Sequence, residues 1–208
     1  MFNIPDSLLK PCNDKMIIAF EGVDGCGKTS LCEKLEEFDH RFHFTRIPSA
    51  YIQRPFKDHL AFNTTHISSA LIYAGSLVDR KRIIDTYDAL DIAITDRSIW
   101  STLTLLYARH PESVQNMIDV FAAIPQHLPI PDVVYVLDVP FSLCQERIMA
   151  RSANVRKYDD MMQEEYNKHL EFYHILKDAG VNIKFVNTEN MSYDDEIRFV
   201  MEDIKNEK

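Results

Sequence analysis

Hydrophobic residues in this chain form short runs rich in β-branched side chains, separated by longer segments of helical period. Five runs predict β-strands, at residues 15–21, 41–47, 91–96, 132–139 and 181–187. The fourth, "DVVYVLDV", is almost continuously apolar, as expected for a strand buried on both faces. Strands that alternate with helices in this way are typical of βαβ units. The pattern therefore predicts one α/β domain with a mainly parallel sheet.

The segments between the strands carry the helical pattern. They predict helices at residues 28–38, 64–87, 99–108, 142–150, 159–177 and 192–208. Ser192 is a plausible N-cap, and Gly180 a C-cap signal. Four prolines between residues 110 and 131 leave room there for at most a short helix. Residues 49–62 are ambiguous, and residues 1–14 are interpreted as an arm that precedes a domain spanning 15–208.

Composition narrows the class of protein. The chain has 208 residues, 46% of them hydrophobic and 26% charged, which argues against wholesale disorder. A formal charge of −9 argues against binding to polymeric nucleic acid or to anionic membranes, because duplex binders usually show a basic face. No apolar run approaches the ~18–20 residues that span a bilayer, and the first residues lack a signal-peptide pattern. Four scattered cysteines indicate reduced thiols in a cytoplasmic protein rather than a zinc site.

The segment "GVDGCGKT" at residues 22–29 fits the phosphate-binding pattern G-x-x-x-x-G-K-[ST]. Glycines let backbone N–H groups turn toward a polyphosphate, and the following helix directs its positive end there. The lysine reaches the β- and γ-phosphates, and the threonine hydroxyl helps to hold Mg²⁺. An accidental match is the alternative, but an apolar strand before the loop and an amphipathic helix after it favour the functional interpretation. ATP or GTP with Mg²⁺ is therefore the expected ligand, bound by Gly22, Gly25, Cys26, Gly27, Lys28, Thr29 and Ser30.

Phosphoryl transfer between two anionic substrates needs cations around the moving group. Arg46 and Arg97 each stand at the end of a predicted strand, where ligands bind in parallel sheets. Asp96, beside Arg97, is placed to orient a metal-bound water. A single arginine at a strand end is usually a surface residue, but two with an aspartate behind a phosphate loop favour a site.

A second group of arginines follows the fourth strand. It consists of Arg147, Arg151 and Arg156 within a basic stretch of an acidic chain. The alternative is a solvated helix face before a loop. We favour a lid at about residues 151–158 that closes over the donor phosphates.

Together the segments "FEGVDGCGKTS", "TRIP", "LIYAGS", "DRSIWS" and "PDVVYVLDVPFSLCQERIMAR" resemble the thymidylate kinases. These are P-loop enzymes that transfer a phosphate from ATP to dTMP. The glycine loop and the last segment are specific, and the resemblance runs from about residue 15 to the C-terminus. It implies a three-layer αβα sandwich with a five-stranded parallel sheet in the order 2-3-1-4-5, helices on both faces and a short lid. It also implies a homodimer.

The resemblance assigns roles to the residues already singled out. Arg46 and Arg97 would hold the acceptor monophosphate, and Asp96 would act near the metal. Arg151 would lie close to the adenine, beside the loop at residues 187–190, and Arg156 would reach the transferred phosphate from the lid. The resemblance therefore implies that the catalytic residues are Lys28, Asp96, Arg97 and Arg156, and that the metal residues are Thr29 and Asp96.

Asp24, inside the glycine loop, matches the aspartate that faces the 3′-hydroxyl of the acceptor sugar in that family. The alternative for Asp24 is a turn-favouring residue that caps local backbone N–H groups. The family's base-stacking aromatic corresponds to Tyr73. Its base-reading arginine, four residues later, is replaced by Leu77, and Arg80, one turn further, is the acceptor-binding candidate in its place. The segment after Arg97 also departs from the family, since Ser98 stands where an aromatic is usual. A uracil derivative, another base or a broad range of acceptors is therefore possible beside thymine.

Two rival functions stay open. "DRSIWS" also resembles the "ERS" region of deoxyribonucleoside kinases, which need a carboxylate base at the end of the second strand. This chain has Arg46-Ile47-Pro48 there, which favours a monophosphate acceptor over a nucleoside. A nucleotide-binding switch that hydrolyses slowly is the third possibility, but Lys28, Thr29 and the lid arginines argue against it. The sequence thus predicts ATP-dependent phosphorylation of a deoxynucleoside monophosphate, with dTMP the first candidate.

Overall fold

The predicted strands form one parallel sheet in the computed structural model, which describes residues 2–11, 13–46, 66–151 and 163–206. The strand order is β2-β3-β1-β4-β5, and every neighbouring pair is parallel, which confirms the predicted topology. The strands are β1 (Met16–Glu21), β2 (Phe42–Arg46), β3 (Ile92–Asp96), β4 (Val133–Asp138) and β5 (Ile183–Asn187). Because the order reverses on either side of β1, the loops that follow β1, β3 and β4 meet at one edge of the sheet.

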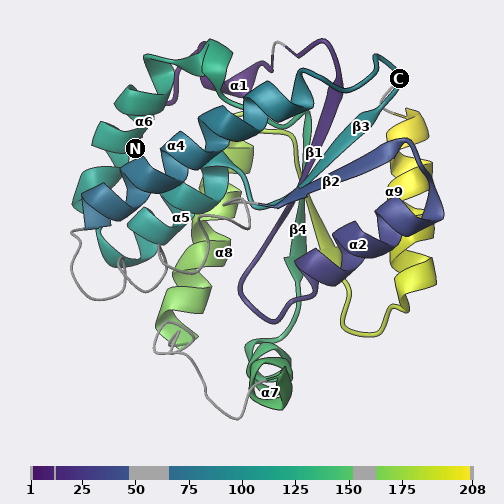
Figure 1. The fold of residues 1–208 in the computed structure, drawn as a ribbon. Helices are drawn as coiled ribbons and strands as arrows, with labels where there is room; N and C mark the ends of the chain where they lie inside the picture. The colour runs from purple at the N-terminus through teal and green to yellow at the C-terminus, as the bar shows by residue number, and fades with distance from the viewer. Residues whose placement is uncertain (1, 12, 47–65, 152–162, 207–208) are drawn as a thin grey trace.

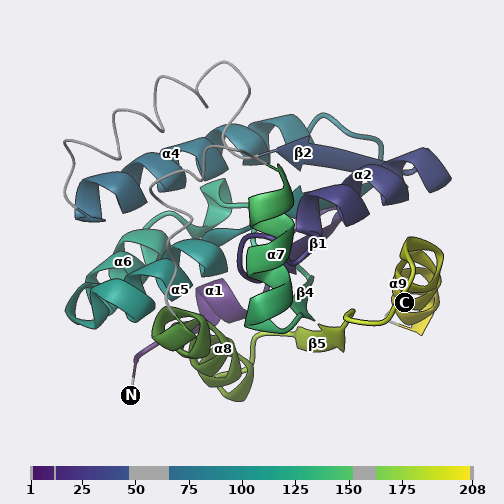
Figure 2. The ribbon, with the colours of Figure 1, turned by 90° about the horizontal axis from the view of Figure 1, so that it is seen from below.

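Helices cover both faces of the sheet (Figure 1), as predicted. One face carries α4 (His66–Ile84), α5 (Ile99–Arg109), α6 (Val114–Ala122) and α8 (Gln163–Asp178). The other face carries α2 (Lys28–Phe38) and α9 (Tyr193–Asn206). Figure 2 looks toward α7 (Phe141–Arg151), which crosses in front of the sheet at the end of β4. The described residues include no helix that is long and apolar enough to cross a membrane.

Alternate residues of the central strands divide the core into two layers. Ala19 of β1 and Val134 of β4 pack with the helices α4, α5, α6 and α8, whereas Ile18 and Tyr135 pack against α2 and α9. All five of the residues from Val133 to Leu137 are buried, which confirms the strand that its continuous apolar run predicted. Apolar side chains on both faces therefore fix the register of these strands, since a slip of one residue would exchange the two layers.

Local signals for the helix ends hold in detail. The Ser192 hydroxyl accepts a hydrogen bond from the Asp195 N–H at 3.2 Å, and the Ser192 N–H donates to the Asp195 carboxylate at 3.3 Å. Gly180 adopts φ 108° after α8, as a C-cap glycine does. The proline-rich connection contains α6, which has nine residues, between two short 3₁₀ turns (Pro111–Ser113 and Pro125–His127).

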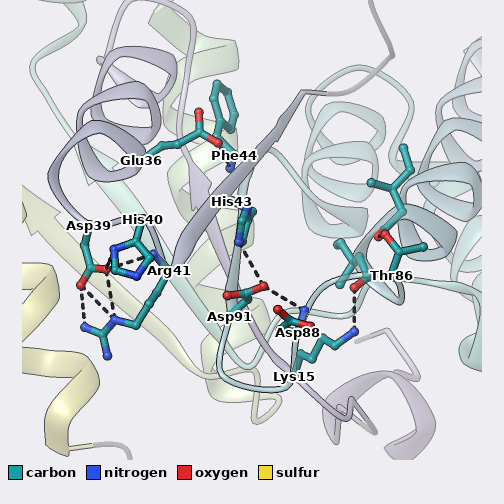
Figure 3. Close-up of polar contacts among 12 residues, drawn as sticks. Lys15, Glu36, Asp39, His40, Arg41, His43, Phe44, Thr86, Asp88 and Asp91 are labelled. Carbon is teal, nitrogen blue, oxygen red and sulfur yellow. Dashed lines mark hydrogen bonds and ion pairs between the residues drawn. The ribbon is translucent and has the colours of Figure 1, made fainter.

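Helix α4 ends at Ile84, three residues earlier than the pattern predicts. The Lys15 ammonium donates to the backbone oxygens of Ile84 and Asp85 at 3.2 and 2.8 Å, and the Tyr87 N–H also donates to the Ile84 oxygen at 3.1 Å. Figure 3 shows Lys15, which directly precedes β1, reaching this helix end. A side chain distant in sequence therefore helps to cap the end of α4, which no local pattern reveals.

Side chains also protect the edge strand β2. The Glu36 carboxylate of α2 accepts a hydrogen bond from the Phe44 N–H at 2.9 Å (Figure 3). The His43 Nε2 atom lies 3.1 Å from the Asp91 carboxylate at the start of β3. An edge strand exposes unpaired backbone groups, and Glu36 supplies a partner for one of them.

Residues near the N-terminus pack on the helical layer. Leu8, in the short helix α1 (Asp6–Leu9), is fully buried in the cluster formed by α4, α5, α6 and α8. The Phe2 ring meets the rings of Tyr107 and Phe172 edge-on, with centroids 6.0 and 5.6 Å away. The segment predicted as an arm is therefore part of the core on this face.

Candidate active site

The glycine loop joins β1 to α2 and adopts a conformation that its glycines permit. Gly22, Gly25 and Gly27 all have positive φ, at 130°, 85° and 110°. A Cβ atom on Gly25 would lie 2.4 Å from the Cys144 backbone oxygen of α7, so the loop packs directly on that helix. A Cβ on Gly27 would meet nothing within 4 Å, so this glycine serves the backbone turn at the start of α2.

Lys28 and Thr29 open α2 directly behind the loop. The buried Lys28 ammonium donates to the Val23 backbone oxygen at 2.7 Å and lies 3.5 Å from the Cys26 sulfur. The Thr29 hydroxyl donates to the Asp96 carboxylate, which ends β3. The positive end of α2 and these two side chains thus gather at one edge of the sheet, an arrangement suited to a bound polyphosphate.

The residues at the end of β3 fit the magnesium ion that the sequence implies. One Asp96 carboxylate oxygen accepts from Thr29, and the other is buried without a hydrogen-bond partner among the described residues. Among those residues, no three His, Cys, Asp or Glu side chains converge on one point as a metal cage would. Mg²⁺ bound to a nucleotide commonly takes one or two protein ligands and completes its shell with water and phosphate oxygens. A hydroxyl and a carboxylate with a spare oxygen match that chemistry.

Arg97 directly follows Asp96 and faces the glycine loop. Its guanidinium forms an ion pair with the Asp24 carboxylate. Its backbone has φ 76°, and it is the one residue other than glycine with positive φ in the part of the chain that the structure describes. Burial acts to lower the pKa of Arg97, but the carboxylates of Asp24, Asp96 and Glu21 outweigh it and hold the pKa above its ordinary value. Arg97 is therefore a permanent cation.

Helix α4 places its predicted acceptor residues unequally. Tyr73 is half-buried, whereas Leu77 belongs to the core and is only 1% exposed. Arg80 is 4% exposed and donates to the Thr45 hydroxyl of β2. Burial lowers the pKa of Arg80 to about 9, although Tyr87 and Asp96 oppose the shift. The guanidinium of Arg80 is thus buried and hydrogen-bonded to β2.

The structure describes the remaining predicted arginines only in part. Arg147 of α7 donates to the Gly25 and Cys26 backbone oxygens at 3.4 and 3.5 Å, and so braces the outside of the glycine loop. Arg46 ends β2 as the register partner of Asp96, and Arg151 ends α7. The side chains of Arg46 and Arg151, all of Arg156 and the predicted lid beyond residue 151 lie outside the described residues. Ser30 lies in the first turn of α2, next to Thr29.

Two buried titratable side chains near Arg97 were not singled out from the sequence. Glu21, the last residue of β1, is fully buried and accepts hydrogen bonds from Ser98, Ser101 and Tyr173. His169 of α8 is 3% exposed, and its Nε2 atom has no hydrogen-bond partner among the described residues. Burial, aided by the charges of Arg97 and Arg109, lowers the pKa of His169 to about 3.

The sequence does hold a signal for both. Glu21 is a charged residue at the end of an otherwise apolar strand. His169 falls with Tyr166, Tyr173 and Leu176 on the buried face of α8. A titratable side chain on an apolar face is a reason to look for a partner or a ligand, because burying it alone is costly.

Comparisons with known proteins agree with this geometry. The family model described as thymidylate kinase matches residues 20–196. A probable thymidylate kinase of Methanococcus aeolicus is 24% identical over 195 residues, which cover 92% of this chain and 96% of the relative. A thymidylate kinase of Ureaplasma parvum is 30% identical over 185 residues, covering 79% and 77%.

Solved structures share the fold. The thymidylate kinase of Candida albicans superimposes with a TM-score of 0.73 at 18% identity, over 93% of this chain and 92% of that one. The deoxyadenosine kinase of M. mycoides, with bound dATP, gives 0.70 at 16% identity, over 91% and 100%. The two kinase types are so alike in fold that the fold leaves the acceptor open. The family model decides between them: the chain belongs to the thymidylate kinase family of nucleoside monophosphate kinases.

Proposed function

We propose that the protein transfers the γ-phosphoryl group of ATP, with Mg²⁺, to the phosphate of a deoxynucleoside monophosphate, most simply dTMP. The observation that carries this proposal is the pair of contacts made by two consecutive residues after β3. Asp96 contacts Thr29 on the donor side of the glycine loop, and Arg97 contacts Asp24 on the other. One short segment therefore links a metal-binding carboxylate with a cation for the acceptor.

The chemistry asks for positioning more than for proton transfer. An oxygen of the acceptor phosphate attacks the γ-phosphorus, and the bond from that phosphorus to the bridging oxygen of ATP breaks. ADP is the leaving group, and the acceptor becomes a nucleoside diphosphate. The acceptor oxygen is already anionic at neutral pH, so no general base is required. Lys28 and the loop N–H groups would hold the donor phosphates, and Mg²⁺ would neutralise charge on them.

On the acceptor side, Arg97 and Arg46 would bind the monophosphate with forked hydrogen bonds. Asp24 would then accept from the sugar 3′-hydroxyl. Arg151, Arg156 and Arg147 complete the proposed donor side. Tyr73 would stack on the acceptor base.

The base itself is less closely specified. Leu77 is buried in the core and Arg80 donates to Thr45, so neither directs a polar group at a base edge from α4. A base held mainly by stacking is discriminated less than one that is hydrogen-bonded, since stacking is available to every base. We therefore expect acceptors beyond dTMP. The comparison structure from Candida albicans is itself described as having broad substrate specificity.

The decisive test measures ADP release with ATP and Mg²⁺ against a panel of the four deoxynucleoside monophosphates, dUMP and the deoxynucleosides. Stimulation by monophosphates, with dTMP among the best, supports the proposal. Stimulation by nucleosides alone would identify a nucleoside kinase. Equal slow release with and without any acceptor would identify a nucleotide switch.

We also propose a cytoplasmic homodimer, on the strength of the family resemblance. Light scattering after size exclusion tests the dimer.

A further inference from the structure

The carboxylate of Glu21 is held by three hydroxyl groups from two helices. The Ser98 hydroxyl donates to one oxygen at 2.6 Å, and the hydroxyls of Ser101 and Tyr173 donate to the other, the latter at 2.9 Å. Ser98 is the N-cap of α5 and Ser101 lies in its first turn, whereas Tyr173 belongs to α8. All four side chains are buried, at 0–4% exposure. The carboxylate thus joins the end of β1 to two helices.

A buried carboxylate is unusual at a position whose role is only to pack a strand against helices. Burying a carboxylate is costly, and apolar residues of similar size often hold a core as well. Burial raises the pKa of Glu21, while the three hydroxyls and the charge of Arg97 pull it back. The arginine that supplies the opposite charge is the residue next to Ser98. A positioned carboxylate here therefore acts on the segment that carries Arg97.

The backbone of that segment needs such support. Arg97 has φ 76°, a conformation that costs on the order of 1 kcal/mol or more for a residue with a side chain. Its N–H donates to the Phe20 oxygen at 3.0 Å, and the side chain of the next residue, Ser98, donates to Glu21. Two consecutive residues of β1 thus anchor two consecutive residues of the β3–α5 loop. A strained conformation persists only where the surroundings fix it in this way.

We infer that Glu21 is a positioning residue for acceptor binding: through its hydrogen bonds with Ser98 and Ser101 it holds Arg97 in the orientation that binds the acceptor phosphate. This inference rests on the proposed function, because it assigns Glu21 no contact with substrate. Glu21 is joined to the glycine loop through the backbone bond to Gly22, but the hydrogen bonds of its carboxylate within the described residues go to Ser98, Ser101 and Tyr173. Its removal consequently affects the two substrates unequally.

The variant Glu21→Gln tests this with little change in shape. We expect the KM for dTMP to rise about tenfold, in line with the sensitivity of phosphate positioning to small displacements, and the KM for ATP to stay within about twofold. Titration calorimetry of dTMP without ATP should show the same loss of affinity. Ser113→Ala, which alters a buried serine in the 3₁₀ turn far from the loop, is the control for burial alone.

A double-mutant cycle separates positioning from stability. If Glu21 acts through Arg97, then Glu21→Gln added to Arg97→Ala causes no further rise in the KM for dTMP, because the group it positions is gone. Additive effects, equal rises in both KM values, or a lower melting temperature with an unchanged KM for dTMP would each overturn the inference.

Failure of the proposed function gives a different pattern. If Arg97→Ala binds dTMP as tightly as the wild type, Arg97 is not the acceptor cation, and both the proposed function and this inference fall. If Arg97→Ala loses dTMP affinity but Glu21→Gln does not, the proposed function stands and only the role of Glu21 is wrong.

Discussion

The proposed donor side of the site is formed mainly by backbone, and the proposed acceptor side by side chains. The donor side is a glycine loop whose backbone is fixed by positive φ values and by contact with α7, so its shape depends on few side chains. The acceptor side consists of side chains from separate elements: Asp24 of the loop, Arg97 after β3 and Tyr73 of α4. A site formed by backbone tolerates little variation in sequence, because its glycines set its shape. A site formed by side chains can change by substitution of one residue at a time. The difference explains why the phosphate loop fits its pattern fully and α4 does not.

The largest expected effect comes from removing the side chain of Lys28, which opens α2 directly behind the loop. Lys28→Ala should lower kcat at least about a hundredfold, because it removes a fixed cation from a developing negative charge. Steady-state ADP release measures it. Lys34→Ala, on the exposed face of the same helix, is the matched control and should act as the wild type. Near-normal turnover in Lys28→Ala would refute the donor-side assignment.

Removing the acceptor cation should have the next largest effect. Arg97→Ala should raise the KM for dTMP about ten- to a hundredfold, as loss of charged hydrogen bonds does, and leave ATP affinity unchanged. Arg109→Ala, at the other end of α5 and paired with Glu165, is the matched control. A titration in which Arg97→Ala weakens the binding of ATP rather than that of dTMP would place Arg97 on the donor side.

A smaller effect is expected from the aspartate that borders both sides. Asp24→Asn keeps the size and turn preference of the residue but weakens its acceptance from a sugar hydroxyl. The ratio of kcat/KM between dTMP and its 3′-deoxy analogue should fall by about fivefold, within the range of one hydrogen bond. Arg97→Ala should weaken the binding of both acceptors alike and so leave this ratio of kcat/KM values unchanged. An unchanged ratio in Asp24→Asn would leave only a turn-capping role for Asp24.

The last expected effect is on stability and not on catalysis: two buried side chains should give opposite pH dependence. Burial lowers the pKa of His169 of α8 to about 3, so folding disfavours its protonated form. The stability it contributes is present above pH 6.5 and is lost as the pH falls from there toward 3. Burial raises the pKa of Glu196, in the first turn of α9, to about 7, opposed by Arg147. Its contribution is present below pH 4.5 and is lost as the pH rises through 7.

Urea unfolding between pH 4.5 and 8 measures both. The free energy of unfolding of the wild type, relative to that of His169→Gln, should rise as the pH rises to about 6.5. Relative to that of Glu196→Gln, it should fall as the pH rises to about 7. Each slope should approach about 1 kcal/mol per pH unit. Slopes of the same sign would contradict the contrast.

Much of the fold was predictable because its signals are local. The apolar runs of β1 and β4, the glycine loop and the caps at Gly180 and Ser192 each specify structure within a few residues, and all were confirmed. The end of α4 was predicted three residues too far, and the structure shows there a cap from Lys15, which is distant in sequence.

The candidate site divides in the same way. Its donor half follows from one short motif. The network around Glu21 joins residues 77 and 152 positions away, and no pattern in the sequence brings them together. Helix period places Tyr73, Leu77 and Arg80 on related faces of α4, but whether that face meets ligand or core depends on how α4 packs. The structure places Leu77 in the core and Arg80 against Thr45.

The packing of the first residues also bears on the order in which the protein folds. Phe2 packs on Tyr107 and Phe172, and the Asn13 amide donates to the Ile130 oxygen at 2.8 Å. Each of these partners is synthesised at least about a hundred residues later, so closing these loops carries a large entropic cost. Residues 2–13 therefore reach their final packing among the last, and they join the helical layer only once α8 has formed.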